Sequence, residues 1–184
     1  MKKVGRKVHL MAPEGSIRRI GEGSFIRLKD NAILFAFTEF LGGREDEDIA
    51  SISVISSADE GESWSERTVL FEKRENDLNI MSFSFLRMEN GDIGAFYIVK
   101  NKDGSDTIVM RRSSDEGKSW SEPQNCLDAL ERPDYFILNN DRVLKLKNGR
   151  IILPLAKHTI YDNDEEQRQY IDIIYRKSVY MEKL

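Results

Sequence analysis

The 184-residue sequence predicts an all-β fold made of repeated four-stranded antiparallel sheets. An eight-residue motif occurs twice, at 57–64 and 113–120, and each copy is preceded by two β-rich runs joined by a tight-turn sequence. No segment shows a sustained helical period of apolar residues. The motif recurs after about 56 residues, which is the length of a repeat that contains four short strands and is typical of a propeller blade.

The first two strands of each repeat are expected to form a hairpin. The turns are Asp30-Asn31, Asn90-Gly91 and Asn148-Gly149 in the three copies. Asn and Gly tolerate the positive φ that a two-residue hairpin turn requires. The strand pairs predicted around these turns are 24–31 with 33–37, 84–91 with 93–97, and 141–149 with 151–155.

A third strand, at 50–55 or 107–110, leads into the eight-residue motif, and a fourth follows it, at 68–71 in the first copy. In the motif, the carboxylate of Asp59 or Asp115 is expected to accept backbone N–H groups of its own loop. The glycine two residues later is expected to take a conformation that other residues resist, and the tryptophan to cover the turn.

Composition and charge exclude some functions. The net charge is −4, and the basic residues form no stripe of the kind that neutralises phosphates, so we expect no nucleic-acid partner. Pro13, Glu14 and Gly15 interrupt the apolar run that a signal peptide would need after the basic start, and we expect no membrane partner and a cytoplasmic location. Cys126 is the only cysteine, so no intrachain disulfide is expected.

The repeated motif, Ser-x-Asp-x-Gly-x-Ser-Trp, resembles the Asp box, or BNR repeat, of the sialidase (neuraminidase)-like β-propeller family. The resemblance covers roughly Ile17 to Tyr175 and includes the segments 34–39 and 138–143. It implies a sialidase-type propeller, which has six blades in the family. The chain holds about two and a half to three blades in one partial domain, with units of roughly 17–75, 76–130 and 131–184, and no third box is found where it would fall, at 171–180. We therefore expect an N-terminal half or a truncated member.

The resemblance also implies an exo-α-sialidase-like glycoside hydrolase with a carbohydrate partner. Such enzymes hold a sugar carboxylate with arginines and use a tyrosine activated by a glutamate, together with an aspartate as acid/base catalyst. The tyrosine and glutamate belong to the C-terminal half of the family's propeller, so we expect the isolated chain to be inactive. We also expect a homo-oligomer or a complementing C-terminal half, because too few blades would leave apolar faces uncovered. The residues expected on those faces are Phe25, Leu34, Phe85 and Ile151.

The acid/base aspartate of the family follows the second strand of the first blade, where Asp46 and Asp48 lie in the acidic loop 41–50. Clustered carboxylates raise one another's pKa, as a proton donor at neutral pH requires. The simpler alternative is a solvated acidic loop. The family's first arginine finds its nearest match in Arg19, although Gly21 replaces a proline of the motif, and another alignment places Glu22 at that position, where it would repel a carboxylate.

Further candidate sugar contacts lie at strand ends. Asn140, Asp141 and Arg142 directly precede a predicted strand, and Arg142 could clamp a carboxylate or hydroxyls. Asn79 occupies the equivalent entry one blade earlier, and His158 ends a strand. Each of these residues has a plain structural alternative. No metal or cofactor motif is found. Two further hypotheses stay open, a non-catalytic carbohydrate-binding or vestigial fragment and a propeller surface for protein partners.

Overall fold

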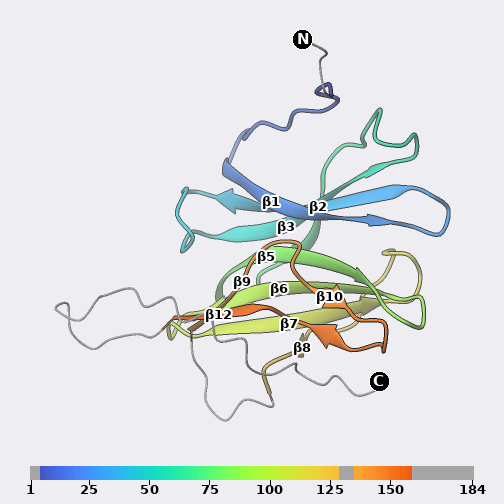
Figure 1. The fold of residues 1–184 in the computed structure, drawn as a ribbon. Coiled ribbons are helices and arrows are strands. Elements are labelled where there is room, and N and C mark those ends of the chain that lie inside the picture. The colour runs from blue at the N-terminus through green and yellow to red at the C-terminus, as the bar shows by residue number, and fades with distance from the viewer. Residues whose placement is uncertain (1–4, 129–134, 159–184) are drawn as a thin grey trace.

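The computed structural model describes residues 5–128 and 135–158. Within these ranges every regular element is a β-strand, and the strands form two four-stranded sheets followed by two small two-stranded ones (Figure 1). All neighbouring strands are antiparallel. The described residues include no helix with the length and apolarity that a membrane crossing requires. The predicted all-β propeller architecture is confirmed, in the form of stacked blades that do not close a ring over the residues described.

The two four-stranded sheets are the first and second blades, and each follows the chain in simple order. The hairpin turns at their first loops have the positive φ expected for Asn31 (72°) and Gly91 (91°). The first blade contains β1 (Ile17–Arg27), β2 (Ile33–Leu41), β3 (Ala50–Ser57) and β4 (Thr68–Glu72). The second contains β5 (Asp77–Arg87), β6 (Ile93–Asn101), β7 (Asp106–Ser113) and β8 (Gln124–Asn125).

The third unit is a hairpin in two pieces. Strand β9 (Tyr135–Leu138) pairs with β12 (Leu155–His158), and β10 (Leu144–Lys145) pairs with β11 (Ile151–Ile152) around a turn at Gly149. It therefore repeats the first two strands of each preceding blade. The position 171–180, where the repeat spacing places a third Asp box, lies outside the described residues, as does much of the predicted unit 131–184.

Both Asp boxes have the local bonding that their sequence predicts. The Asp59 carboxylate accepts hydrogen bonds from the Ser63 hydroxyl (2.6 Å), the Ser63 N–H (2.9 Å) and the Ser57 hydroxyl (2.9 Å), which hold the pKa of Asp59 at about 2. Trp64 donates its ring N–H to the carbonyl of Gly61, whose φ is +84°. The second box repeats each of these contacts, with Asp115, Ser119 and Trp120.

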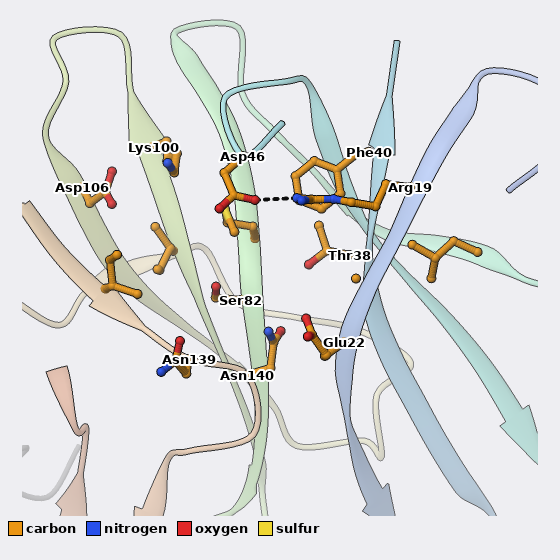
Figure 2. Close-up of a pocket in the computed structure, with 15 residues that line it drawn as sticks. Arg19, Glu22, Thr38, Phe40, Asp46, Ser82, Lys100, Asp106, Asn139 and Asn140 are labelled. Atoms are coloured by element: carbon orange, nitrogen blue, oxygen red, sulfur yellow. Dashed lines mark hydrogen bonds and ion pairs between the residues drawn. The ribbon is translucent and has the colours of Figure 1, made fainter. Parts of the chain in front are cut away.

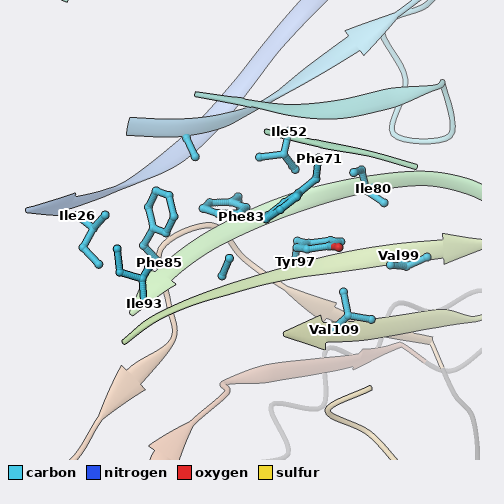
Figure 3. Packing of buried hydrophobic residues seen from close by; sticks show 12 residues of the cluster. Ile26, Ile52, Phe71, Ile80, Phe83, Phe85, Ile93, Tyr97, Val99 and Val109 are labelled. Carbon is cyan, nitrogen blue, oxygen red and sulfur yellow. The ribbon is translucent and has the colours of Figure 1, made fainter. Parts of the chain in front are cut away.

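The principal core lies between the first and second blades (Figure 3). Phe85, which was expected on an uncovered face, is 5% exposed here, and Ile151, at 6%, is buried in a second cluster between the second blade and the third unit. That expectation was wrong for these two residues, because the preceding unit in the chain covers each of them: the first blade covers Phe85, and the second blade covers Ile151. Phe25 is 58% exposed, and Leu34 is partly buried.

Charged side chains tie the blades together at the hairpin turns. Arg27 forms a two-pronged ion pair with Glu60 of the first box, at 2.8 Å for both bonds, and Arg87 does the same with Glu116 of the second box, at 2.7 and 2.9 Å. Glu116 also accepts the N–H of Lys29 (2.9 Å) and lies 3.1 Å from its ammonium group. Glu116 therefore joins its own blade to the preceding one.

Candidate functional site

A cleft of about 610 Å³ opens where the first two blades and the third unit meet (Figure 2). Its walls come from β1, β2, β5, β6 and β7 and from the segment around β9. The cleft includes the loop before β3 and the start of β7. The Asp boxes follow the other ends of these two strands, one box after β3 and one after β7. The eight residues of β3 or β7 separate the two ends by roughly 25 Å. The cleft and the boxes are therefore on opposite sides of the blades.

Arg19 and Asp46 form the central ion pair of the cleft, at 2.5 Å. The guanidinium carbon of Arg19 lies 3.6 Å from the centre of the Phe40 ring, a cation–π contact that fixes the plane of the arginine. The Nε of Arg19 is buried and has no hydrogen-bond partner among the described residues. Because the pair holds both side chains over the cleft, Asp46 is presented there as a hydrogen-bond acceptor.

Asn79 holds the acidic loop in place from the second blade. Its side-chain amide donates to the backbone carbonyls of Asp46 and of Asp48, the latter at 2.9 Å. Asn79 is fully buried and does not line the cleft. The Asp48 carboxylate accepts the N–H of Glu45 at 2.8 Å and so shapes the loop from within. Asn79 thus positions Asp46.

The segment 139–142 is bonded to a bulge in β5. Asn140 accepts the N–H of Phe83 (2.9 Å), and the N–H of Arg142 reaches the hydroxyl of Ser84 (3.1 Å). The bulge turns Ser82 to a φ of 58° at the wall of the cleft. The amide oxygen of Asn140 is therefore committed to the fold, and its amide nitrogen is left for the cleft.

Asp106 is a cleft residue that the sequence analysis did not single out. It is 5% exposed, and its Oδ2 atom has no hydrogen-bond partner among the described residues. Burial raises the pKa of Asp106 to about 6; Lys100, its partner across β6 and β7, opposes the shift and Glu47 adds to it. The loop 101–106 is the counterpart in the second blade of the acidic loop, so alignment of the two repeats could have identified this aspartate.

Two other polar residues complete the walls. The hydroxyl of Thr38, a residue 2% exposed, has no hydrogen-bond partner in the described part of the chain. Glu22 is exposed at the bulge of β1 and forms no ion pair with any described residue. The cleft therefore combines bonded side chains with polar groups that lack partners among the described residues.

The structure brings together some of the predicted site residues and separates others. Arg19, Asp46 and Asn140 line one cleft. Asp48 bonds within the acidic loop, and Asn79 donates to the backbone of that loop from the second blade. Asp141 accepts a hydrogen bond from Ser24 at 2.7 Å. Arg142 has an exposed position outside the cleft, and the side chain of His158 lies outside the described part of the structure. Glu22, which one alignment placed at the arginine position, lines the cleft with Arg19.

Within the described ranges, no group of three or more His, Cys, Asp or Glu side chains is arranged to hold a metal ion. The chemistry that the cleft itself offers is hydrogen bonding and proton transfer by carboxyl groups.

The fold and the two Asp boxes define a segment of an antiparallel β-propeller. The family model of the BNR repeat-like domain matches residues 31–177, and the chain belongs to this family. No curated protein matches the sequence.

Solved structures of sialidases share the fold. The intramolecular trans-sialidase from Ruminococcus gnavus is 10% identical with a TM-score of 0.64, over 77% of this chain and 56% of that one. The NanB sialidase from Streptococcus pneumoniae is 12% identical with a TM-score of 0.63, over 82% and 43%. A Hadza microbial sialidase is 14% identical with a TM-score of 0.62, over 75% and 32%. The chain thus spans between about a third and somewhat more than half of these relatives.

Proposed function

We propose that the chain is the glycan-binding part of a sialidase-family glycoside hydrolase and that the cleft between its blades holds a sugar. The observation that carries this proposal is the convergence of Arg19, Asp46 and Asn140 on one cleft, in whose wall two buried atoms, Thr38 Oγ1 and Asp106 Oδ2, have no hydrogen-bond partner among the described residues. An unpaired buried polar atom costs roughly 1–3 kcal/mol, and a ligand hydroxyl that reached either atom would offset that cost.

The remainder of the lining supports the same class of ligand. Arg19 and Asn140 supply donors, and Asp46 supplies an acceptor. Met81, Ile98 and Ile137 add apolar surface for the C–H faces of a sugar ring. A few converging polar groups on a partly apolar wall are typical of small-molecule sites. The sialidase relatives named above make a glycan the first ligand class to test.

For hydrolysis, the proton-transfer group would be Asp46, as the family resemblance implies, or Asp106. A carboxyl group with a pKa near 6 is suited to donate a proton at neutral pH, which favours Asp106 for the acid role. Glycoside cleavage requires a second group across the bond. Hydrolysis is proposed for a longer protein in which other blades supply that group, and we expect the chain alone to give no turnover of a fluorogenic sialoside.

The binding proposal is tested with Thr38→Val. The substitution keeps the shape of the side chain and removes a hydroxyl that bonds nothing described in the protein, so we expect unchanged or higher thermal stability. Saturation-transfer NMR with a panel of monosaccharides should show binding by the wild type and binding weaker by about fivefold in the variant. Ser65→Val, at the Asp-box end of the blade, is the control. A wild type that binds no sugar would contradict the proposal.

The second candidate is a fragment that binds carbohydrate without catalysis. The ion pair of Asp46 with Arg19 favours it, because the Asp46 carboxylate is already bonded within the protein. Turnover of a sialoside by the chain that disappears in Asp46→Asn would rule out this candidate. We also propose that the chain forms a homo-oligomer or pairs with a complementing C-terminal half. A cytoplasmic location is likewise a proposal.

A further inference from the structure

We infer that the cleft takes an uncharged sugar in preference to a sugar acid. This inference names the ligand class of the cleft and rests on the proposed glycan binding. Five charged side chains line the cleft, and three of them are carboxylates: Glu22, Asp46 and Asp106 against Arg19 and Lys100. Selectivity follows from how these charges are already paired.

Both cations are matched by carboxylates of the protein. Arg19 is 2.5 Å from Asp46 and is stacked on Phe40, so turning it towards a new anion would break two contacts. The ammonium group of Lys100 is 3.5 Å from Glu47, and Lys100 lies opposite Asp106 across β6 and β7. A ligand carboxylate would therefore compete with charges that the fold has already placed there.

Glu22 decides the balance, because it adds a negative charge that no described cation neutralises. It stands at the β1 bulge, between Ile20 and Gly23 in the register of β1 with β2. A ligand carboxylate within about 6 Å of it would be repelled, and in a partly screened site the penalty corresponds to roughly a tenfold loss of affinity.

A hydroxyl group suits the same lining, because it both donates and accepts. It can donate to Glu22, and it can accept from the side-chain amide nitrogen of Asn140, which bonds no described residue. Thr38 Oγ1 is buried in the same wall and has no hydrogen-bond partner among the described residues. An uncharged sugar can therefore satisfy these groups without opposing Glu22.

The test compares matched pairs of sugars at neutral pH by saturation-transfer NMR: methyl glucoside with methyl glucuronide, and methyl galactoside with methyl galacturonide. We expect the uncharged member of each pair to bind about tenfold more tightly to the wild type. Glu22→Gln should remove most of this difference by improving binding of the acids. Glu66→Gln, the same change at the exposed Asp-box end, should leave the difference intact.

The outcomes separate the two proposals. Acids that bind the wild type as tightly as their uncharged partners, or a preference that survives in Glu22→Gln, would overturn the inference while leaving glycan binding in place. Tighter binding of N-acetylneuraminic acid than of every uncharged sugar would also overturn the inference and leave glycan binding in place. If none of these sugars binds the folded wild type, both the proposed function and this inference fail.

Discussion

The hydroxyl of Ser24 donates a hydrogen bond of 2.7 Å to the carboxylate of Asp141, although 117 residues separate them in the sequence. The same hydroxyl accepts the N–H of Phe85 at 2.9 Å. One buried side chain of the first blade therefore bonds both the second blade and the third unit. This junction lies next to the cleft, because Asn140 precedes Asp141 in the chain.

Ser24→Ala should destabilise the protein, because the change leaves the N–H of Phe85 without an acceptor and removes a donor from Asp141. We expect the free energy of unfolding in urea to fall by about 1–3 kcal/mol. Ser84→Ala is the matched control, since Ser84 is equally buried and its hydroxyl accepts only the N–H of Arg142 among the bonds described. A loss in Ser24→Ala no larger than in Ser84→Ala would contradict the bridging role.

Glu116→Gln should weaken the contact between the first two blades. Arg87 lowers the pKa of Glu116 to about 2, with Lys29 contributing, and this stabilisation is present above pH 4.5 and is lost as the pH falls towards 2. Allowing for solvent screening, we expect a loss of about 1 kcal/mol at pH 7. Glu60→Gln should cost less, because Glu60 pairs with Arg27 of its own blade alone. Equal losses in urea unfolding would show that the bond to Lys29 contributes nothing.

Gly117→Ala should be more damaging than Gly104→Ala. Both glycines have positive φ, +88° and +85°, so alanine is strained at either by roughly 1 kcal/mol. At Gly117 the added Cβ would also lie 3.2 Å from Leu34 of the first blade, whereas at Gly104 it meets nothing within 4 Å. The difference between the two melting temperatures therefore measures how tightly the second Asp box packs on the first blade. Identical melting temperatures would mean that Leu34 moves aside without cost.

Asp106 should make the stability of the protein depend on pH between about 4 and 6. Its pKa is raised from 3.8 to about 6 by burial, so the folded state keeps a proton that the unfolded state has already released. This contribution is fully present below pH 3.8 and is lost as the pH rises through 6, by at most about 3 kcal/mol. Asp106→Asn should flatten the profile of melting temperature in this window. Lys100 and Glu47 are the charged groups that face the Asp106 carboxyl group. An NMR signal of the Asp106 carboxyl group that titrates near pH 4 in the wild type would refute the prediction.

Self-association should depend on the outer face of the first blade. Phe25, Ile49 and Val69 are 58%, 51% and 54% exposed, and apolar side chains gathered on one face favour association. Val69→Lys should reduce the molar mass measured by light scattering at high concentration. Gln124→Lys adds the same charge on β8, the equivalent edge strand of the second blade, and should have no such effect. A wild type that stays monomeric at every concentration would disprove association.

The sequence by itself determined the turns and motifs whose hydrogen bonds join residues only a few positions apart. Asn31, Gly91 and both Asp boxes could be predicted, because the atoms that bond one another lie within a few residues and depend on local backbone conformation. The repeat length then indicated the blade architecture. The sequence also made Asp46 of the acidic loop a site candidate, and the structure places Asp46 in the lining of the cleft.

Only the tertiary structure decided which side chains share the cleft. Asp106 joins Asp46 and Glu22 because the second blade stacks on the first, and Asn79 lies under the acidic loop for the same reason. Phe85 is buried by contacts between blades, which its own strand pattern could not predict. Such contacts join residues that are far apart in the chain, and they form only when whole sheets stack to bury their apolar faces. The neighbours of a residue in the sequence therefore do not specify which residues it will contact.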